Sequence, residues 1–225
     1  MQFARINGQR KRAKDVHSGD IGKCLWTGLS VKAKVGELRQ YWTYIGEKPK
    51  MPQGYENETI WHYNWKSLVK DDFCEIIFGE NNEHRADIVG NNNTIIEVQL
   101  SPIDIRVVRE RIEFYRKITK DRMIWIVDAT KYFKNTFDIE KSEQFFKVKW
   151  KNKRQWVYLI AQNIDCHLFL DINHKKNYLL KTWVNNGEIF CVFYEKTKFY
   201  KEYLSEVGQC ETVEKIIERL TNNEK

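Results

Sequence analysis

Apolar and polar residues follow two different periods along the chain, and the changes of period divide it into segments. Between residues 18 and 47, short β-branched and aromatic stretches are interrupted by glycines, a pattern typical of short strands. Residues 47–57 hold two of the 3 prolines, which predicts a linker. Trp61, Trp65 and Leu68 then follow helical spacing. Asn57 is the candidate N-cap of this helix.

From about residue 58 to residue 130, the pattern predicts helix, strand, strand, strand, helix, strand. After the first helix come a strand over 73–79, a hairpin over 84–101 with its turn at Asn91–Asn93, a helix over 103–118 and a strand over 122–130. The last of these is apolar at almost every position, so it is expected to be buried on both faces and central in a sheet. This order indicates an α/β core.

Beyond residue 131 the apolar stretches predict mostly strands, WVYLIAQ (156–162) among them, and VEKIIERL (213–220) predicts a final helix. We therefore expect three segments. Residues 1–57 form a small β-rich lobe and linker, residues 58–130 the α/β core, and residues 131–225 a β-rich extension that ends in a helix.

Composition narrows the class of protein. The chain has 225 residues and is 42% apolar, which suffices for a packed core. No apolar run approaches the roughly 20 residues of a membrane helix, and no apolar signal segment follows the basic N-terminus. The 5 cysteines are scattered without a CxxC pair, which favours a reducing cytoplasm over a disulfide framework or zinc ribbon. The formal net charge of +7 favours a polyanionic partner, most commonly nucleic acid.

Three polar residues interrupt the hairpin where aliphatic side chains are expected: Asp87, Glu97 and Gln99. With a three-residue turn, Asp87 falls opposite Glu97, and opposed residues share a face with Cβ atoms about 5 Å apart. Two like charges in that position destabilise a hairpin unless a cation lies between them, and a hard divalent ion held by carboxylates meets this need. The alternative is a solvated polar face of a surface hairpin.

The neighbouring helices contribute three further candidates. On a helical wheel, Arg111 lies near the middle of the apolar arc of the helix over 103–118, so it needs an anionic partner, either a carboxylate or a phosphate. A plain structural ion pair is the alternative. His62 and Lys66 lie one turn apart beside the tryptophan stripe. They are either functional or an ordinary amphipathic border.

The residues in this order resemble the competence protein CoiA family of the PD-(D/E)XK nuclease superfamily. The corresponding stretches are WHYNWK with His62 and Lys66, a strand with Glu75, RAD over 85–87, IEVQLS over 96–101, and RIEFY over 111–115. The resemblance covers residues 58–130 well and the C-terminal region loosely. It implies a restriction-endonuclease-like core, a mixed central sheet flanked by helices, with β-rich N- and C-terminal extensions.

The resemblance also implies a metal-dependent active site. Asp87 and Glu97 would bind Mg²⁺ or Mn²⁺, Glu75 would be an outer ligand or an orienting carboxylate, and the Val98 carbonyl would be a further ligand. Gln99 occupies the place of the superfamily's catalytic lysine. The remaining implied roles are charge stabilisation by Lys66 and Arg111, protonation or phosphate binding by His62, and nucleic-acid binding by Arg85, Arg111 and Tyr115.

Two departures from the superfamily pattern matter. Ala86 replaces a proline that carries no chemistry. Gln99 replaces the lysine, and an amide cannot transfer a proton at neutral pH, although it can orient a water molecule or a phosphate oxygen. Lys66 would then supply the missing positive charge. Cys24 stands alone in its region, so no N-terminal zinc module is expected.

The predicted function is Mg²⁺-dependent hydrolysis of DNA phosphodiester bonds. The competing hypotheses are a non-catalytic DNA-binding recombination-accessory protein that keeps the fold, an RNA-cleaving nuclease, and a structural or interaction protein. The last of these does not explain Asp87 and Arg111 together. A homodimer is an option, since many nucleases of this type cut two strands as dimers.

Overall fold

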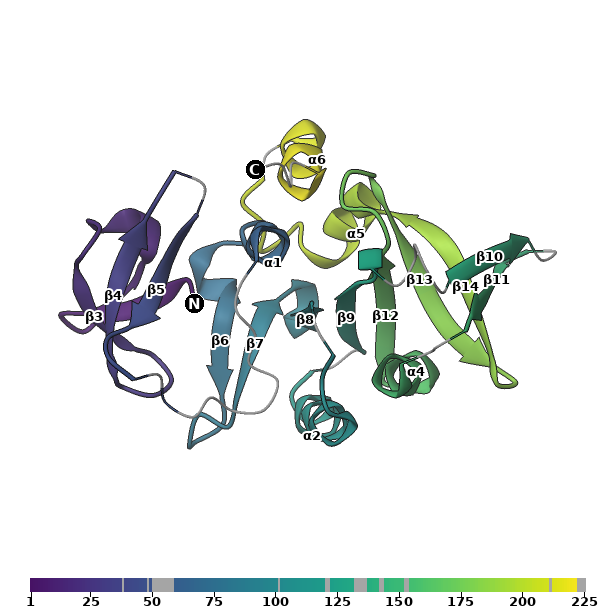
Figure 1. Ribbon diagram of the computed structural model, residues 1–225, viewed down its shortest axis with the longest axis horizontal. Coiled ribbons are helices and arrows are strands. Elements are labelled where there is room, and N and C mark those ends of the chain that lie inside the picture. Colours follow the sequence, from purple (N-terminus) through teal and green to yellow (C-terminus); the bar gives the residue numbers. More distant parts are fainter. Residues whose placement is uncertain are drawn as a thin grey trace.

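A five-stranded sheet and a nine-stranded sheet organise the protein in the computed structural model (Figure 1). The structure describes residues 1–37, 39–47, 49, 59–100, 102–119, 122–131, 137–141, 144–151, 154–210 and 212–221. Asn57, Ser101 and most of the predicted linker lie outside these residues.

The five-stranded sheet forms an N-terminal lobe, and all of its neighbouring strands are antiparallel. Its strands are β1 (Phe3–Ile6), β2 (Gln9–Arg12), β3 (Ile21–Cys24), β4 (Ser30–Val35) and β5 (Gln40–Tyr44), in the order β2-β1-β3-β4-β5. The Trp42 N–H donates to the Met1 carbonyl at 2.9 Å, which links β5 back to the start of β1. The side chains of Ala4, Cys24, Val31 and Trp42 fill the interior of the lobe. Strands β1 and β2 were not predicted, because QRKR lacks the apolar alternation that marks a strand.

The nine-stranded sheet is mixed. Its strands are β6 (Cys74–Phe78), β7 (His84–Val89), β8 (Ile95–Gln99), β9 (Met123–Asp128), β10 (Phe137–Lys141), β11 (Phe146–Trp150), β12 (Cys166–Asp171), β13 (Tyr178–Asn185) and β14 (Glu188–Glu195), in the order β10-β11-β14-β13-β12-β9-β8-β7-β6. Strands β8, β9 and β12 are parallel neighbours, and the other pairs are antiparallel.

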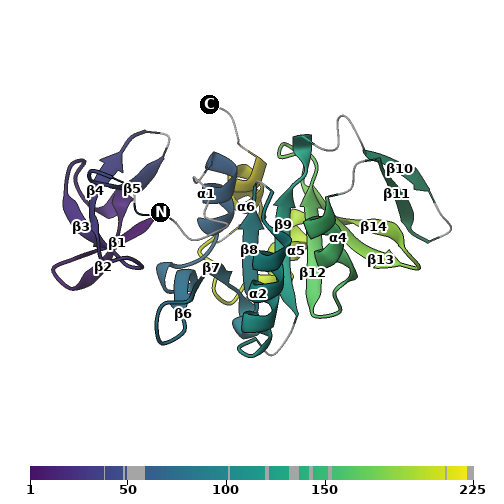
Figure 2. The same ribbon diagram turned by 60° about the horizontal axis from the view of Figure 1, so that its bottom comes forward.

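Helices cover both faces of this sheet (Figure 2). They are α1 (Ile60–Lys66), α2 (Ile105–Arg116), α4 (Gln155–Gln162), α5 (Lys196–Tyr203) and α6 (Val213–Thr221). Helices α2 and α4 lie on one face, whereas α1, α5 and α6 lie on the other. The predicted fold class, a mixed sheet flanked by helices with an additional β-rich lobe, is confirmed.

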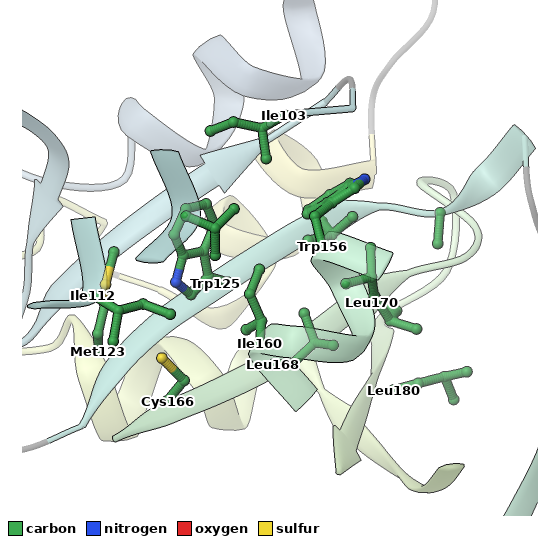
Figure 3. Close-up of a cluster of buried hydrophobic side chains, with 14 of the residues drawn as sticks. Ile103, Ile112, Met123, Trp125, Trp156, Ile160, Cys166, Leu168, Leu170 and Leu180 are labelled. Atoms are coloured by element: carbon green, nitrogen blue, oxygen red, sulfur yellow. The ribbon is translucent and has the colours of Figure 1, made fainter. Parts of the chain in front are cut away.

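Each face of the sheet has its own core. Strand β9 is buried at all of its positions and sends Trp125 and Val127 to the core under α2 and α4 (Figure 3). Ile124 and Ile126 of the same strand enter the core under α1, α5 and α6. The prediction that this segment is a central strand buried on both faces is therefore confirmed.

The structure corrects several predicted elements. WVYLIAQ is helix α4 rather than a strand: Trp156, Val157 and Ile160 share the buried face of a helix, and a short apolar run fits either structure. Helix α5 was not predicted. The helix predicted over 103–118 spans Ile105–Arg116, with Asp104 as its N-cap. Helix α1 is capped by Thr59, whose side chain accepts from the His62 N–H.

The third predicted segment does not form a separate sheet. Its strands β10 to β14 continue the sheet of residues 74–128, through the parallel pairing of β12 with β9. The boundary at residue 130 therefore does not separate two sheets, and the division of the chain into domains stays a prediction. The predicted final helix is present as α6. No helix among the described residues combines the length and apolarity needed to cross a bilayer, and all five cysteines are free thiols.

Candidate active site

Strands β7 and β8 separate at Asp87. Val89 pairs with Ile95 and Ile88 with Ile96, and this register continued by one step sets Asp87 level with Glu97, as predicted. The recorded pairing ends there. In its place, the Val98 N–H donates to Asp87 Oδ2 at 3.0 Å. The Asp87 carboxylate thus bridges the two strands where the backbone ladder ends.

The two carboxylates reach different helices. Ile95 lies in the core under α2, and Ile96 and Val98 lie in the core under α1, so alternation directs Glu97 toward α2. Asp87 instead contacts α1. The prediction that the side chains of Asp87 and Glu97 point to the same face of the sheet is therefore wrong. The reason is local: Ala86 and Val89 both pack under α2, so the strict alternation of β7 is broken around Asp87.

Glu97 is buried, with 2% of its surface exposed, and pairs with the predicted guanidinium. Arg111 Nη1 lies 2.5 Å from Glu97 Oε2. Glu97 Oε1 is also buried and makes no hydrogen bond of ordinary length among the described residues, although the Tyr115 hydroxyl lies near enough to this carboxylate to lower its pKa. Desolvation raises the pKa of Glu97 to about 7, against the effect of Arg111 and with a further contribution from the charge of Asp87. Glu97 Oε2 thus has a charged partner, whereas Oε1 makes no hydrogen bond of ordinary length.

Asp87 is held by the first helix. His62 Nε2 lies 3.2 Å from Asp87 Oδ2, and Lys66 Nζ lies 3.9 Å from Oδ1. Desolvation alone would raise the pKa of Asp87, but His62, Lys66 and the Val98 N–H together lower it below its ordinary value. His62 and Lys66 therefore act in the site by keeping Asp87 ionised.

Glu75 has an unusual backbone and a complete set of partners. Its φ of 52° lies in the left-handed region, which is uncommon for a residue other than glycine and occurs often at functional sites. Its carboxylate lies 2.5 Å from Lys66 Nζ and accepts from the Gln2 N–H at 3.2 Å. Lys66 and Arg85 outweigh desolvation and lower its pKa well below the ordinary value. Glu75 thus pairs with Lys66, and the role that the resemblance implied for it, an outer ligand or an orienting carboxylate, stays a prediction.

The three remaining predicted site residues, Gln99, Arg85 and Tyr115, differ in burial and in the carboxylates that they approach. Gln99 is buried two residues beyond Glu97 on the same strand. Arg85 Nη1 lies 3.9 Å from Glu75 Oε2. Tyr115, predicted to bind nucleic acid, is fully buried, so its ring is not available to a ligand at the surface. Desolvation and then the charge of Glu97 raise its pKa, which places its hydroxyl as a neighbour of that carboxylate.

Comparison with known proteins agrees with this geometry. The family model described as "Competence protein CoiA, nuclease-like domain" matches residues 75–199, more than half of the chain. This protein belongs to the CoiA family. Searches of curated proteins and of solved structures return no match. The resemblance found in the sequence is confirmed, and a nuclease-related role follows for the matched domain.

Asp87 and Glu97 of the CoiA nuclease-like domain reach toward different helices, but they lie close enough for the charge of Asp87 to raise the pKa of Glu97, which is the proximity that a shared cation would require. No group of three His, Cys, Asp or Glu side chains in the described part of the chain is arranged to hold a metal ion. Mg²⁺, however, is commonly held by one or two carboxylates together with water and substrate phosphates. Glu97 Oε1, which makes no hydrogen bond of ordinary length, and the ionised Asp87 fit that requirement. The residues present therefore fit a Mg²⁺ ion that is completed by the substrate.

A second buried polar cluster in the CoiA domain was missed by sequence reasoning. Asp128 and Asp171 are register partners at the ends of the parallel strands β9 and β12. Asp171 Oδ2 lies 2.9 Å from Lys196 Nζ and accepts from Trp61 Nε1 at 2.9 Å. Asp128 Oδ1 lies 3.1 Å from His174 Nε2. Since Trp61 precedes His62, this cluster fixes the helix that holds Asp87.

One signal in the sequence points to this cluster. The apolar stretches MIWIVD and CHLFLD both end in aspartate, and the carboxyl ends of parallel strands meet at one edge of a sheet. The partner Lys196, in contrast, had no visible signal, because it lies in a basic stretch that reads as solvent-exposed.

Proposed function

We propose that this CoiA-family protein hydrolyses phosphodiester bonds of DNA at the site formed by Asp87 and Glu97, with bound Mg²⁺ or Mn²⁺. The observation that carries the proposal is the buried Glu97 carboxylate, which has one oxygen on Arg111 and one that makes no hydrogen bond of ordinary length. A buried acid with a pKa near 7 is typical of a site prepared for a ligand. The nuclease-like family match supports the same reaction class.

Each residue has a role that follows from its contacts. Asp87 and Glu97 hold the divalent cation, which when bound lowers the pKa of water and neutralises charge on the phosphate. Arg111 orients Glu97 and, with 15% of its side chain exposed, also presents positive charge to phosphate oxygens. His62 and Lys66 orient Asp87. Gln99, which has no titratable proton, orients the attacking water or a phosphate oxygen.

A second candidate function is a non-catalytic DNA-binding accessory protein. Two observations favour it. Gln99 replaces the lysine of the superfamily pattern, and Lys66 pairs with the buried carboxylate of Glu75. An RNA-cleaving nuclease is the remaining alternative, because the carboxylates would act on either backbone.

A cleavage assay separates these functions. The wild-type protein is incubated with labelled single- and double-stranded DNA and RNA in the presence of Mg²⁺, Mn²⁺ or EDTA. We expect DNA cleavage that requires the cation and that is lost in Glu97→Ala. Binding without cleavage by the wild type would support the accessory role, and preferential cleavage of RNA would support the third function. Cleavage that persists in Glu97→Ala would contradict the assignment of the site.

The raised pKa of Glu97 predicts a dependence of stability on pH. The ordinary value of 4.5 and the value of about 7 differ by roughly 3 kcal/mol in free energy. Because the folded state binds the proton more tightly, the metal-free protein loses stability as the pH rises from about 4.5 to about 7. A proton on Glu97 also competes with the cation. We therefore expect Mg²⁺ to raise the melting temperature more at pH 8 than at pH 6.

The control for this prediction is Glu97→Gln, which has nearly the same shape but cannot ionise. The difference between wild type and Glu97→Gln removes the contributions of all other titrating groups, such as His84. Equal Mg²⁺ shifts at the two pH values, or an unchanged pH dependence in Glu97→Gln, would show that Glu97 is not the linked group.

Cytoplasmic location and dimerisation stay predictions. Size-exclusion chromatography with light scattering of the wild-type protein measures the oligomeric state directly.

A further inference from the structure

The strands of the N-terminal lobe carry positive charge without any negative charge. Strands β1 to β5 contain no Asp or Glu. Their cationic residues are Arg5, Arg10, Lys11, Arg12, Lys23, Lys32 and Lys34. Intramolecular ion pairs within these strands therefore do not neutralise this surface, unlike most mixed protein surfaces.

Three of these cations stand directly opposite one another. Arg5 is the register partner of Arg10 on β2 and of Lys23 on β3. Like charges at opposed positions destabilise a sheet. Arg10 is compensated, because its guanidinium donates to the carbonyls of Asp71 and Cys74. Arg5 and Lys23 are exposed to solvent. The sheet thus maintains a repulsive arrangement that an anionic ligand would relieve.

Apolar and aromatic side chains lie between the cations on the same outer face. Lys32 is the partner of Ile21, which is 55% exposed, and of Thr43. Lys34 is the partner of Tyr41. The Tyr41 ring lies 5.0 Å from the Arg39 guanidinium. The Tyr41 ring is half-buried. A surface that combines cations with an aromatic ring is typical of sites that bind unpaired nucleotides, which offer both phosphates and bases.

The outer face contains a hollow of about 390 Å³ at Tyr41. Lys34 and Arg39 line this hollow with Tyr41, together with Glu37 and Ser18. One edge of the Tyr41 ring is therefore accessible beside two cations. This combination suits a base that stacks on or packs against the ring while its phosphate contacts a lysine.

The lobe lies beside β6, the edge strand next to the β7–β8 hairpin that carries Asp87 and Glu97 (Figure 1). A crevice of about 380 Å³ lies between the lobe and β6, lined by Arg5 and Arg10 on one side and by Glu75 and Ile76 on the other. Trp26 of the lobe donates its Nε1 hydrogen to the Asn82 carbonyl at 2.7 Å. The Arg85 guanidinium lies 5.5 Å from the Trp26 ring and acts electrostatically on Glu97. Asp72 also lines this crevice, so the cations Arg5, Arg10 and Arg85 lead toward the site along one side, opposite the carboxylates of Asp72 and Glu75.

We propose that the outer face of the five-stranded lobe binds a single-stranded polynucleotide and leads it along the crevice toward Glu97. Arg5, Lys23, Lys32 and Lys34 contact the phosphates, and Ile21 and Tyr41 contact unpaired bases. A duplex would satisfy the cations but would leave the aromatic hollow without an occupant. The inference rests on the proposed nuclease function for its substrate class, but binding to the lobe can be measured without cleavage.

The test measures the binding of a fluorescein-labelled dT₃₀ by anisotropy in EDTA, over a range of NaCl concentrations. The variants are Lys32→Gln/Lys34→Gln and Tyr41→Ala. The matched control is Lys198→Gln/Lys201→Gln, which removes the same charge from the exposed side of α5. We expect the lysine pair to weaken binding about tenfold and to reduce the slope of log K against log salt by about 1.4, the value for two phosphate contacts on a single strand. Tyr41→Ala should weaken binding by about tenfold.

The outcomes separate the two proposals. Equal affinity of the wild type and Lys32→Gln/Lys34→Gln, or tighter binding of a 30-base-pair duplex than of dT₃₀, would overturn the inference. If either of these results is found and the wild type still cleaves DNA, the proposed nuclease function stands although the lobe does not bind single strands. Binding of dT₃₀ that depends on Lys32, Lys34 and Tyr41, without cleavage in Mg²⁺, would support the inference and contradict the nuclease proposal. Failure of the wild type to bind dT₃₀ would also overturn the inference.

Discussion

Replacing Lys196 with methionine is expected to lower the free energy of unfolding by about 3–5 kcal/mol, because removal of one partner from a buried ion pair leaves an uncompensated charge. Lys196 and Asp171 both have 0% of their surface exposed. Without the ammonium group, Asp171 keeps the Trp61 N–H as a donor, and its Oδ1 already has no hydrogen-bond partner among the described residues. The His174 carbonyl also loses a donor. Urea denaturation followed by tryptophan fluorescence measures the loss.

The matched control is Lys201→Met on the same helix. Lys201 is exposed, so the same chemical change there should alter stability by no more than about 0.5 kcal/mol. A loss below 1 kcal/mol in Lys196→Met would mean that the Asp171 site hydrates or rearranges, and that this cluster does not fix α1 through Trp61.

The hairpin site was predictable because its signal is local. The alternation of apolar residues in IIEVQ, the length of the Asn91–Asn93 turn and the place of Arg111 on its helix all follow from short stretches of sequence. These features were sufficient to predict that Asp87 is level with Glu97 and that Arg111 has an anionic partner. The family resemblance then assigned chemistry to that arrangement.

The direction of Asp87 was not predictable, because it depends on packing between distant elements. The separation of β7 from β8 lets the Val98 N–H bind the carboxylate, and α1 adds His62 and Lys66 from the opposite layer. The positive φ of Glu75 likewise has no signal in CEIIF, which reads as an ordinary strand. Alternation rules assume a regular ladder, and the ladder is irregular where the chemistry is placed.

Short apolar stretches were the second feature whose structure could not be predicted from the sequence. WVYLIAQ satisfies the pattern of a buried strand and that of a buried helix, and only its packing against β12 and β13 decides between them. The strands QRKR and SVKAKV show the converse. In QRKR the cations obscured a strand, and Arg12 there is buried beside Asp71. In SVKAKV, Lys32 and Lys34 are exposed on one face of the strand.

Replacing Lys66 with methionine is expected to have two separable effects. Lys66 is 2% exposed, and its Nζ lies 2.5 Å from Glu75 Oε1 and 3.9 Å from Asp87 Oδ1. Loss of its charge leaves the buried Glu75 poorly compensated, which should destabilise the fold by about 3–5 kcal/mol. It also raises the pKa of Asp87, since Lys66 helps to lower it. A residue that orients a metal ligand typically changes metal affinity or activity by about 10–100-fold. We therefore expect a higher Mg²⁺ concentration for half-maximal cleavage.

The double variant Lys66→Met/Glu75→Gln separates these effects, because it removes both members of the buried pair. Its stability should recover most of the loss seen in Lys66→Met, as expected when a buried charge is removed together with its partner. Its requirement for Mg²⁺ should stay raised, since Asp87 still lacks Lys66. If the Mg²⁺ requirement returns to the wild-type value together with stability, Lys66 serves only to neutralise Glu75. Restored stability with persistently weak Mg²⁺ activation would instead identify Lys66 as the residue that supplies positive charge at Asp87, where Gln99 cannot.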